Sequence, residues 1–182
     1  AYEGGHRVPF IVRWPGQVKP GTRSHEIIVL TDIMATCADI LGIDLPTDTA
    51  EDSVSLLPVL RGEKVEKPLH DVVIHHSVSG HFAIRKDQWK LLLCRGSGGW
   101  SPPREAEAAK KKLPMLQLYD LASDPRETKN LQAKYPGKVV ELANGLAKAI
   151  REGRTIPGPR QANQGWPNTI PKPIREKFPQ LA

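Results

Sequence analysis

Residues 81–94, which read HFAIRKDQWKLLLC, decide the fold of this chain. They form two β-prone runs separated only by Asp87-Gln88, a spacing that is typical of a tight hairpin. A turn of this length sets the register of an antiparallel pair, so that Lys86 lies opposite Trp89 and Ile84 lies opposite Leu91. The stretch therefore predicts two neighbouring strands of an antiparallel sheet.

Two further runs extend this hairpin to four strands. The expected strands, in chain order, are Asp71–His76, His81–Lys86, Trp89–Cys94 and Met115–Leu121. The connector Ser77–Gly80 is expected to place Phe82 opposite His75. One face of the sheet then collects the apolar side chains, which are Val73, Phe82, Ile84, Trp89, Leu91 and Leu93. A helix that starts after Pro136 and carries Leu142 and Leu146 at helical spacing is expected to cover this face.

The segments before the sheet predict one strand and two helical pieces. Val8–Trp14 is typical of a buried strand that ends at Pro15-Gly16. Thr31–Gly42 predicts a helix with Thr31 as the N-cap and Gly42 as the stop. Apolar residues recur along it at helical spacing, at Ile33, Cys37, Ile40 and Leu41. Ser55–Arg61 predicts a short helical turn.

Composition shifts suggest three parts, residues 1–62, 63–153 and 154–182, with the charged connector Glu63–Pro68 as the first boundary. The last part holds six of the 17 prolines and an excess of basic residues, which predicts an extended tail. The net charge of +6 is concentrated there rather than on a shaped basic face, and no nucleic-acid motif is present. The longest aliphatic runs are too short to cross a bilayer. Neither a nucleic-acid-binding nor a membrane protein is expected.

Three histidine and cysteine side chains are expected as cross-strand neighbours at one end of the sheet. His76, His81 and Cys94 lie there on the less apolar face and offer three ligands for a zinc ion with an open position. A metal-free cluster held by hydrogen bonds is the alternative. His75, on the opposite face beside Phe82, is expected to be a core histidine.

A glycine-rich loop, Gly96–Pro103, emerges close to this histidine group. Ser97 and Trp100 are its polar and aromatic members, and a Trp ring suits the apolar face of a sugar or an aryl group. The alternative is a loop in which Trp100 closes the core. In the opening motif Glu3-Gly4-Gly5-His6-Arg7, Glu3 and Arg7 are expected to brace the backbone, while His6 remains a candidate ligand residue.

No complete catalytic set is present in this sequence. A Gly-x-Ser-x-Gly motif is absent, and Ser77 beside His76 has no positioned acid partner. Asp124-Pro125 is expected to start a turn, with the Asp124 carboxylate as its cap.

In their order along the chain, several of these segments resemble the C-terminal part of the formylglycine-dependent sulfatases of the arylsulfatase type, in the alkaline-phosphatase-like superfamily. The segments are Tyr2–Pro9 with Trp14–Gly16, the helix Thr31–Gly42, Ser55–Gly62, Phe82–Arg85 with Trp89–Leu91, and Leu118–Leu121 with Asp124, Pro125, Glu127, Asn130 and Leu131. The resemblance implies an α/β fold, seen in this chain as α+β. Residues 1–62 would then be the terminal strand and helix of a large α/β domain. A small four-stranded antiparallel sheet packed on a C-terminal helix would follow.

The resemblance also implies hydrolysis of a sulfate ester by a formylglycine hydrate, with a divalent cation, as a rule calcium, on the sulfate oxygens. This chain has neither group: Cys37 is not followed by the x-Pro-x-Arg that the family's formylglycine motif requires. We expect a truncated chain that is inactive alone and lacks its N-terminal catalytic portion. Its role would be to line the cleft for a sulfated small molecule or glycan through His6, His76, His81, Ser97 and Trp100. The family suggests a bacterial, periplasmic or secreted protein.

Two other functions are compatible with the residues alone. One is a stand-alone carbohydrate-binding module that uses Trp100 and the histidines. The other is a zinc-binding domain built on His76, His81 and Cys94.

Overall fold

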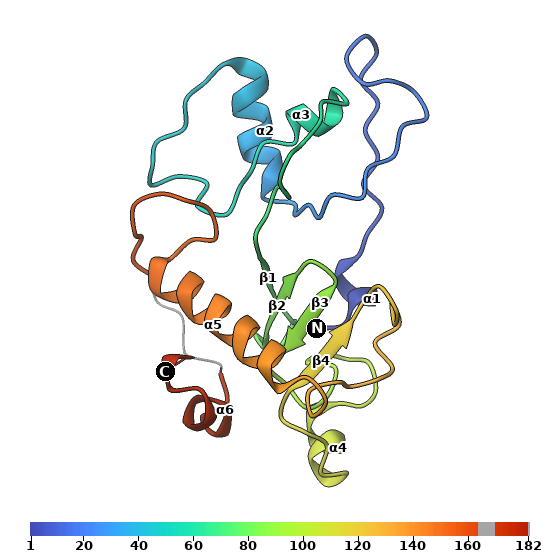
Figure 1. The fold of residues 1–182 in the computed structure, drawn as a ribbon, viewed down its shortest axis with the longest axis vertical. Coiled ribbons are helices and arrows are strands. Elements are labelled where there is room, and N and C mark those ends of the chain that lie inside the picture. Colours follow the sequence, from blue (N-terminus) through green and yellow to red (C-terminus); the bar gives the residue numbers. More distant parts are fainter. Residues whose placement is uncertain (164–169, 182) are drawn as a thin grey trace. The chain divides into compact units, whose positions relative to one another are not determined.

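The computed structural model describes residues 1–163 and 170–181, and the chain forms two compact units (Figure 1). The sheet unit contains Ala1–Val8, Ile74–Arg151 and the described residues from Asn163 onward. The helical unit contains Pro9–Val73 and Glu152–Ala162. The divisions thus differ from the expected ones, because the first eight residues join the sheet and the main division lies at Val73. None of the described helices is long and apolar enough to cross a membrane.

The sheet has the predicted four strands in the order β1-β2-β3-β4. These are β1 Val73–His76, β2 Phe82–Lys86, β3 Trp89–Leu92 and β4 Gln117–Asp120. The register of β2 and β3 is confirmed, with Lys86 opposite Trp89 and Ile84 opposite Leu91. The β3–β4 pair is antiparallel as well. The short turn specifies this register because its two ends are already neighbours in the sequence.

The turn between β1 and β2 is tighter than predicted. The N–H of Ser77 donates to the carbonyl of His81 at 2.9 Å, and the N–H of Gly80 donates to the carbonyl of Ser77 at 2.9 Å. Gly80 has a φ of 78°, so Val78–Gly80 is a three-residue loop that ends in a left-handed glycine. The loop was expected to start at Ser77. Because Ser77 instead pairs with His81, the register of β1 against β2 shifts by one residue.

This shift corrects two predicted side-chain positions. The His76 ring packs against the Phe82 ring, with centroids 4.2 Å apart, so His76 lies on the face that was assigned to His75. The His75 ring instead lies against the His6 ring, with centroids 3.8 Å apart. A shift of one residue exchanges the two faces of a strand, so both histidines changed sides.

Both faces of the sheet are covered. Helix α5, Pro136–Glu152, packs over the face that carries Trp89 and Ile84, as predicted (Figure 1). The Trp89 ring meets the Tyr135 ring at the start of this helix, and Val139, Leu142 and Leu146 of α5 are buried. The opposite face buries Ala83, Leu92, Cys94 and Tyr119 beneath Ala1 and Tyr2. The opening segment, including α1 Glu3–His6, therefore closes the second face.

In the helical unit, α2 spans Asp32–Leu41 and α3 spans Leu57–Leu60, close to their predicted positions. Thr31 occupies the N-cap position of α2 but makes no capping bond with its side chain. The buried Asp32 carboxylate instead accepts the N–H groups of Val29 and Val54 and lies 3.0 Å from His70 Nε2. The predicted apolar face of α2 is solvent-exposed, as Ile33, Ile40 and Leu41 show.

The predicted strand Val8–Trp14 does not form. Ile11 is 88% exposed, and in the described part of the chain no strand pairs with this segment. A strand needs a neighbour for its backbone N–H and C=O groups, so the β-prone residues alone do not produce one.

The expected extended tail is also corrected, because residues 172–181 form α6 Lys172–Lys177 and the 3₁₀ turn η1 Pro179–Leu181. Four apolar side chains there are buried, and they are Ile170, Ile174, Phe178 and Leu181. Their spacing is that of a helix face, and Pro173 stands in the first turn, where proline is tolerated. Pro167 of the predicted tail lies outside the described residues.

Candidate functional site

The loop 96–103 lies beside the β1–β2 turn, as expected. A Cβ placed on Gly98 would lie 2.9 Å from Ser77 Oγ, and one on Gly99 would lie 3.3 Å from Val78 Cγ1. The φ of Gly98 is 67°, so both the left-handed backbone and the close approach require glycine at this position. The two segments form one edge of the sheet unit.

Hydrogen bonds brace this loop throughout. The buried Ser97 hydroxyl donates to the carbonyl of Ser101 at 2.6 Å and accepts the N–H of Gly99 at 3.1 Å. The Glu105 carboxylate accepts the N–H groups of Arg95 and Gly96 at 3.2 and 2.7 Å. Glu105 begins the short helix α4, Glu105–Lys110. The Ser97 hydroxyl is used by the backbone of the loop 96–103, so this side chain shapes the loop.

Trp100 does not close the core. Its side chain stands at the tip of the braced loop and is 78% exposed. Of the two alternatives for this residue, an accessible aromatic surface is therefore the correct one.

His81 lies at the base of the same edge. Its backbone N–H donates to Ser77 Oγ at 3.1 Å, and its buried Nδ1 has no hydrogen-bond partner among the described residues. His76 does not join it, since its ring packs on Phe82.

Cys94 is not placed as a zinc ligand. Burial raises the pKa of this thiol to about 12, and its Sγ donates to the carbonyl of Gly96 at 3.3 Å. In residues 1–163 and 170–181, no three or more His, Cys, Asp and Glu side chains are arranged to hold a metal ion. The zinc-binding alternative, which needed His76 beside His81 and Cys94, therefore finds no support in the structure.

His6 lies at the end of α1, where its ring lies against the His75 ring. Burial lowers the pKa of His6, with smaller contributions from the chain's amino terminus and Lys90. The pKa of His75 falls to about 2, chiefly through burial and then through Lys90 and His6. Both imidazoles are thus held neutral.

A buried charge cluster beneath these rings was missed in the sequence. Lys90 is fully buried, and its Nζ lies 2.9 Å from Glu3 Oε1 and 3.0 Å from Glu127 Oε1. The Glu127 carboxylate also accepts the N–H of Glu3 at 2.6 Å. Glu3 was expected to brace the backbone, but its carboxylate pairs with the Lys90 side chain, and the Glu127 carboxylate accepts the backbone N–H instead. The signal in the sequence was Lys90 itself, because the other residues of β3 are all apolar or aromatic.

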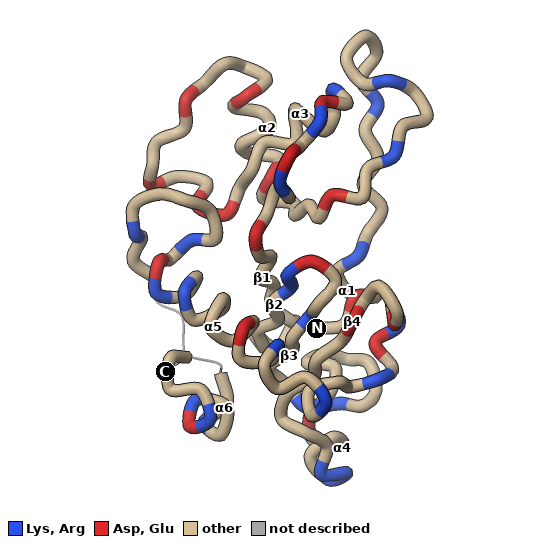
Figure 2. Tube along the Cα trace, in the orientation of Figure 1, with Lys and Arg blue, Asp and Glu red and all other residues tan. Residues whose placement is uncertain are grey.

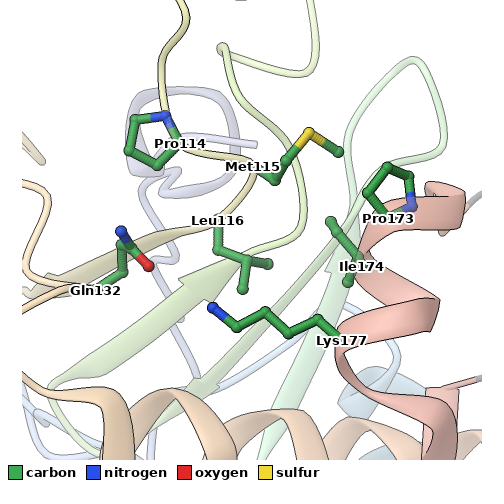
Figure 3. Close-up of a pocket in the computed structure, with 7 residues that line it drawn as sticks. All are labelled: Pro114, Met115, Leu116, Gln132, Pro173, Ile174 and Lys177. Atoms are coloured by element: carbon green, nitrogen blue, oxygen red, sulfur yellow. The ribbon is translucent and has the colours of Figure 1, made fainter.

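Two cavities of the described structure have no histidine in their lining. One, of about 270 Å³, lies between α6 and the segment before β4 and is lined by Pro114, Met115, Leu116, Gln132, Pro173, Ile174 and Lys177 (Figure 3). The other, of about 200 Å³, lies in the helical unit beside the buried Arg154. The Arg154 guanidinium donates to the carbonyls of Thr47, Ile156 and Pro159, so it ties two segments together.

Comparison with known proteins gives one consistent group. A family model described as N-sulphoglucosamine sulphohydrolase, C-terminal, matches residues 1–97. The chain is 35% identical over 146 residues to an N-acetylgalactosamine-6-O-sulfatase of Bacteroides thetaiotaomicron, a match that covers 80% of the chain and 28% of the relative. It is 31% identical over 178 residues to human arylsulfatase A, a match that covers 90% of the chain and 34% of the relative.

Solved structures agree. A structure from work on glycosaminoglycan metabolism by Bacteroides thetaiotaomicron superposes with a TM-score of 0.66 at 34% identity, covering 82% of this chain and 30% of the other. A protein in complex with its substrate, D-glucosamine-2-N,6-O-disulfate, superposes with a TM-score of 0.57 at 26% identity, covering 76% and 27%. The chain thus spans about a third or less of the proteins it matches.

Proposed function

The chain belongs to the sulfatase family, and we propose that it is the C-terminal part of a longer enzyme that hydrolyses sulfate esters. The observation that carries this proposal is the match of 80% of the chain to only 28% of a sulfatase. Among the described residues no three or more His, Cys, Asp and Glu side chains are placed to hold a metal ion, so we assign the sulfuryl chemistry to the rest of the enzyme.

The exposed apolar surface of the helical unit supports this division. Ile11 is 88% exposed, Leu30 68% and Leu41 70%. The β-prone segment 8–14 is unpaired, and the face of α2 with helical apolar spacing is bare. Apolar surface of this extent marks an interface. We assign it to the catalytic portion, where segment 8–14 would find neighbouring strands and α2 would pack on the sheet that they form.

Formylglycine and a divalent cation, calcium as a rule, are proposed for that catalytic portion. The residues of this chain do not fit either group. Cys37 is followed by Ala38-Asp39-Ile40, and among the described residues no three or more His, Cys, Asp and Glu side chains are grouped to hold a metal ion. No step of the reaction is therefore placed on a side chain of this chain.

The role proposed for the sheet unit is to contact the substrate beyond its sulfate group. The residues proposed for this contact are His81, next to the β1–β2 turn, Trp100 in the loop 96–103, and His6 at the end of α1. Ser97 is not kept as a contact residue, because its hydroxyl is used by the loop backbone. His76 is withdrawn from this set, since it packs on Phe82.

Sulfate release tests the proposal. The purified chain, supplied with calcium and nitrophenyl sulfate, is expected to show no turnover. A protein that extends the chain at its N-terminus and contains the formylglycine motif is expected to release sulfate and to lose this activity with a chelator. Turnover by the chain alone that survives repurification and disappears in His81→Ala would refute the proposal.

A further inference from the structure

We infer that Trp100 and Arg104 form a subsite for one sugar ring of a sulfated glycan. This inference rests on the proposed function for the identity of the glycan as a substrate. It rests on the loop itself for the binding.

The first observation is an exposed aromatic ring on a rigid support. The Trp100 side chain is 78% exposed, yet Ser97, Glu105 and Gln117 all hydrogen-bond the loop backbone below it. A loop backbone held in this way loses little further conformational entropy when a ligand binds to it. A flat apolar surface of this size matches the apolar face of a pyranose ring.

The second observation is a cation beside that ring. The Arg104 Nε donates to the carbonyl of Trp100 at 3.3 Å, which anchors the guanidinium to the loop tip. Its two terminal nitrogens, the Nη atoms, make no hydrogen bond or ion pair within the described structure, so their donors remain available. A guanidinium with free donors binds a sulfate or carboxylate group in bidentate fashion.

The third observation is the charge around the loop. Basic side chains surround it, at Arg95, Arg104, Lys110, Lys111 and Lys112, and α4 ends in blue in Figure 2. Two acidic residues stand among them, and both are engaged: Glu105 accepts backbone N–H groups, while Glu107 pairs with Lys111 at 2.7 Å. The surface therefore favours an anionic ligand.

Val78 extends the apolar surface. It is 65% exposed at the tip of the β1–β2 turn, and its Cγ1 adjoins Gly99 of the loop. An exposed aliphatic side chain next to the loop, together with the Trp100 ring and the Arg104 guanidinium, fits a sugar ring that has an apolar face and a negatively charged substituent. A neutral glycan would leave the Arg104 N–H donors without an anionic partner.

Calorimetric titration of the purified chain with a chondroitin sulfate hexasaccharide and its desulfated counterpart tests the inference. We expect Trp100→Ala to weaken binding of the sulfated glycan about tenfold, and Trp100→Phe to restore most of it. Arg104→Gln is expected to abolish the preference for the sulfated over the desulfated glycan. Lys111→Gln is the control. It removes the same charge from a nearby side chain that is already paired with Glu107, so it should change glycan binding little.

Three results would overturn the subsite: unchanged affinity in Trp100→Ala, equal binding of both glycans by the unaltered chain, or equally tight binding of nitrophenyl sulfate. An unchanged melting temperature shows that each variant is folded. The two proposals fail separately. Glycan binding through Trp100 without sulfatase activity in the extended protein would leave a carbohydrate-binding module, whereas activity that is independent of Trp100 would leave a sulfatase without this subsite.

Discussion

The ammonium group of Lys90 lies 2.9 Å from a carboxylate oxygen of Glu3, and the two residues are 87 positions apart in the chain. Lys90 is on β3 and is fully buried, while Glu3 is on a helix of four residues that contains two glycines. So short a helix has little stability of its own. The contact therefore fixes the opening segment on the sheet and gives the buried lysine a second carboxylate partner beside Glu127.

Lys90→Met should destabilise the sheet unit strongly. The substitution leaves the Glu3 and Glu127 carboxylates buried without their shared cation, and loss of one partner of a buried pair costs about 3–5 kcal/mol. Urea unfolding followed by circular dichroism measures the loss. Lys111→Met, which breaks the exposed pair with Glu107, is the control and should cost under about 1 kcal/mol. If both substitutions lowered the free energy of unfolding by equally small amounts, the buried charge cluster would contribute little to stability.

Stability should fall as the pH drops below neutrality. The folded-state pKa of His75 is about 2, against 6.5 for the free side chain, because burial disfavours the charged ring. Below pH 6.5 the unfolded chain therefore binds a proton that the folded chain does not, and the stability that depends on neutral His75 is lost progressively toward pH 2. The groups around it, Lys90, His6, His76 and the amino terminus, all act in the same direction.

Thermal melts at pH 7.5 and 5.5 check this. His75→Phe keeps a ring beneath His6 but cannot bind a proton, so its melting temperature should fall less between the two pH values. If the melting temperature of His75→Phe fell as far as that of the unaltered chain, the pH dependence would not come from His75.

Gly98→Ala should disturb the loop. The added methyl would lie 2.9 Å from Ser77 Oγ and 3.0 Å from Ser77 Cβ, and the φ of 67° is unfavourable for alanine. Left-handed strain of this kind costs about 1–3 kcal/mol, and glycan binding should weaken with it. Gly99→Ala is the matched control, since its nearest contact is 3.3 Å from the end of the Val78 side chain. If Gly98→Ala and Gly99→Ala were equally stable, the loop would have adjusted to the added methyl group without cost.

Ile174→Ala should show that the C-terminal segment is part of the fold. Ile174 is 1% exposed, and removal of a buried aliphatic side chain of this size costs about 2–5 kcal/mol. A tail without packing would tolerate the change. Lys172→Ala, on the same helix with a side chain 80% exposed, is the control. Denaturant titration compares the two.

The isolated chain should self-associate through the helical unit. Leu41 and Ile11 are 70% and 88% exposed, and an apolar surface with an unpaired β-prone segment promotes association. The double substitution Ile11→Glu/Leu41→Glu should shift the chain toward monomer in sedimentation velocity. A concentration-independent monomer before substitution would argue against a covered interface in the complete enzyme.

Where neighbours in space are neighbours in sequence, the sequence by itself determined the result. The β2–β3 register follows from a two-residue turn, and α5 follows from apolar spacing after Pro136. The loop 96–103 beside the β1–β2 turn was predictable in the same way, because both follow from strand order. The order of the sulfatase-family motifs along the chain could also be recognised from the sequence alone.

Other features were decided only by the tertiary structure. Whether Ser77 belongs to the β1–β2 turn or to its ladder depends on one pair of hydrogen bonds, and this choice exchanged His75 and His76 between the faces. The burial of Lys90 depends on carboxylates contributed by α1 and by the turn after β4. Segment 8–14 has strand propensity, but among residues 1–163 and 170–181 no strand lies beside it. In each case the outcome depends on a partner distant in the chain, because a residue's own propensity is worth less free energy than a buried pair or a ladder of backbone hydrogen bonds.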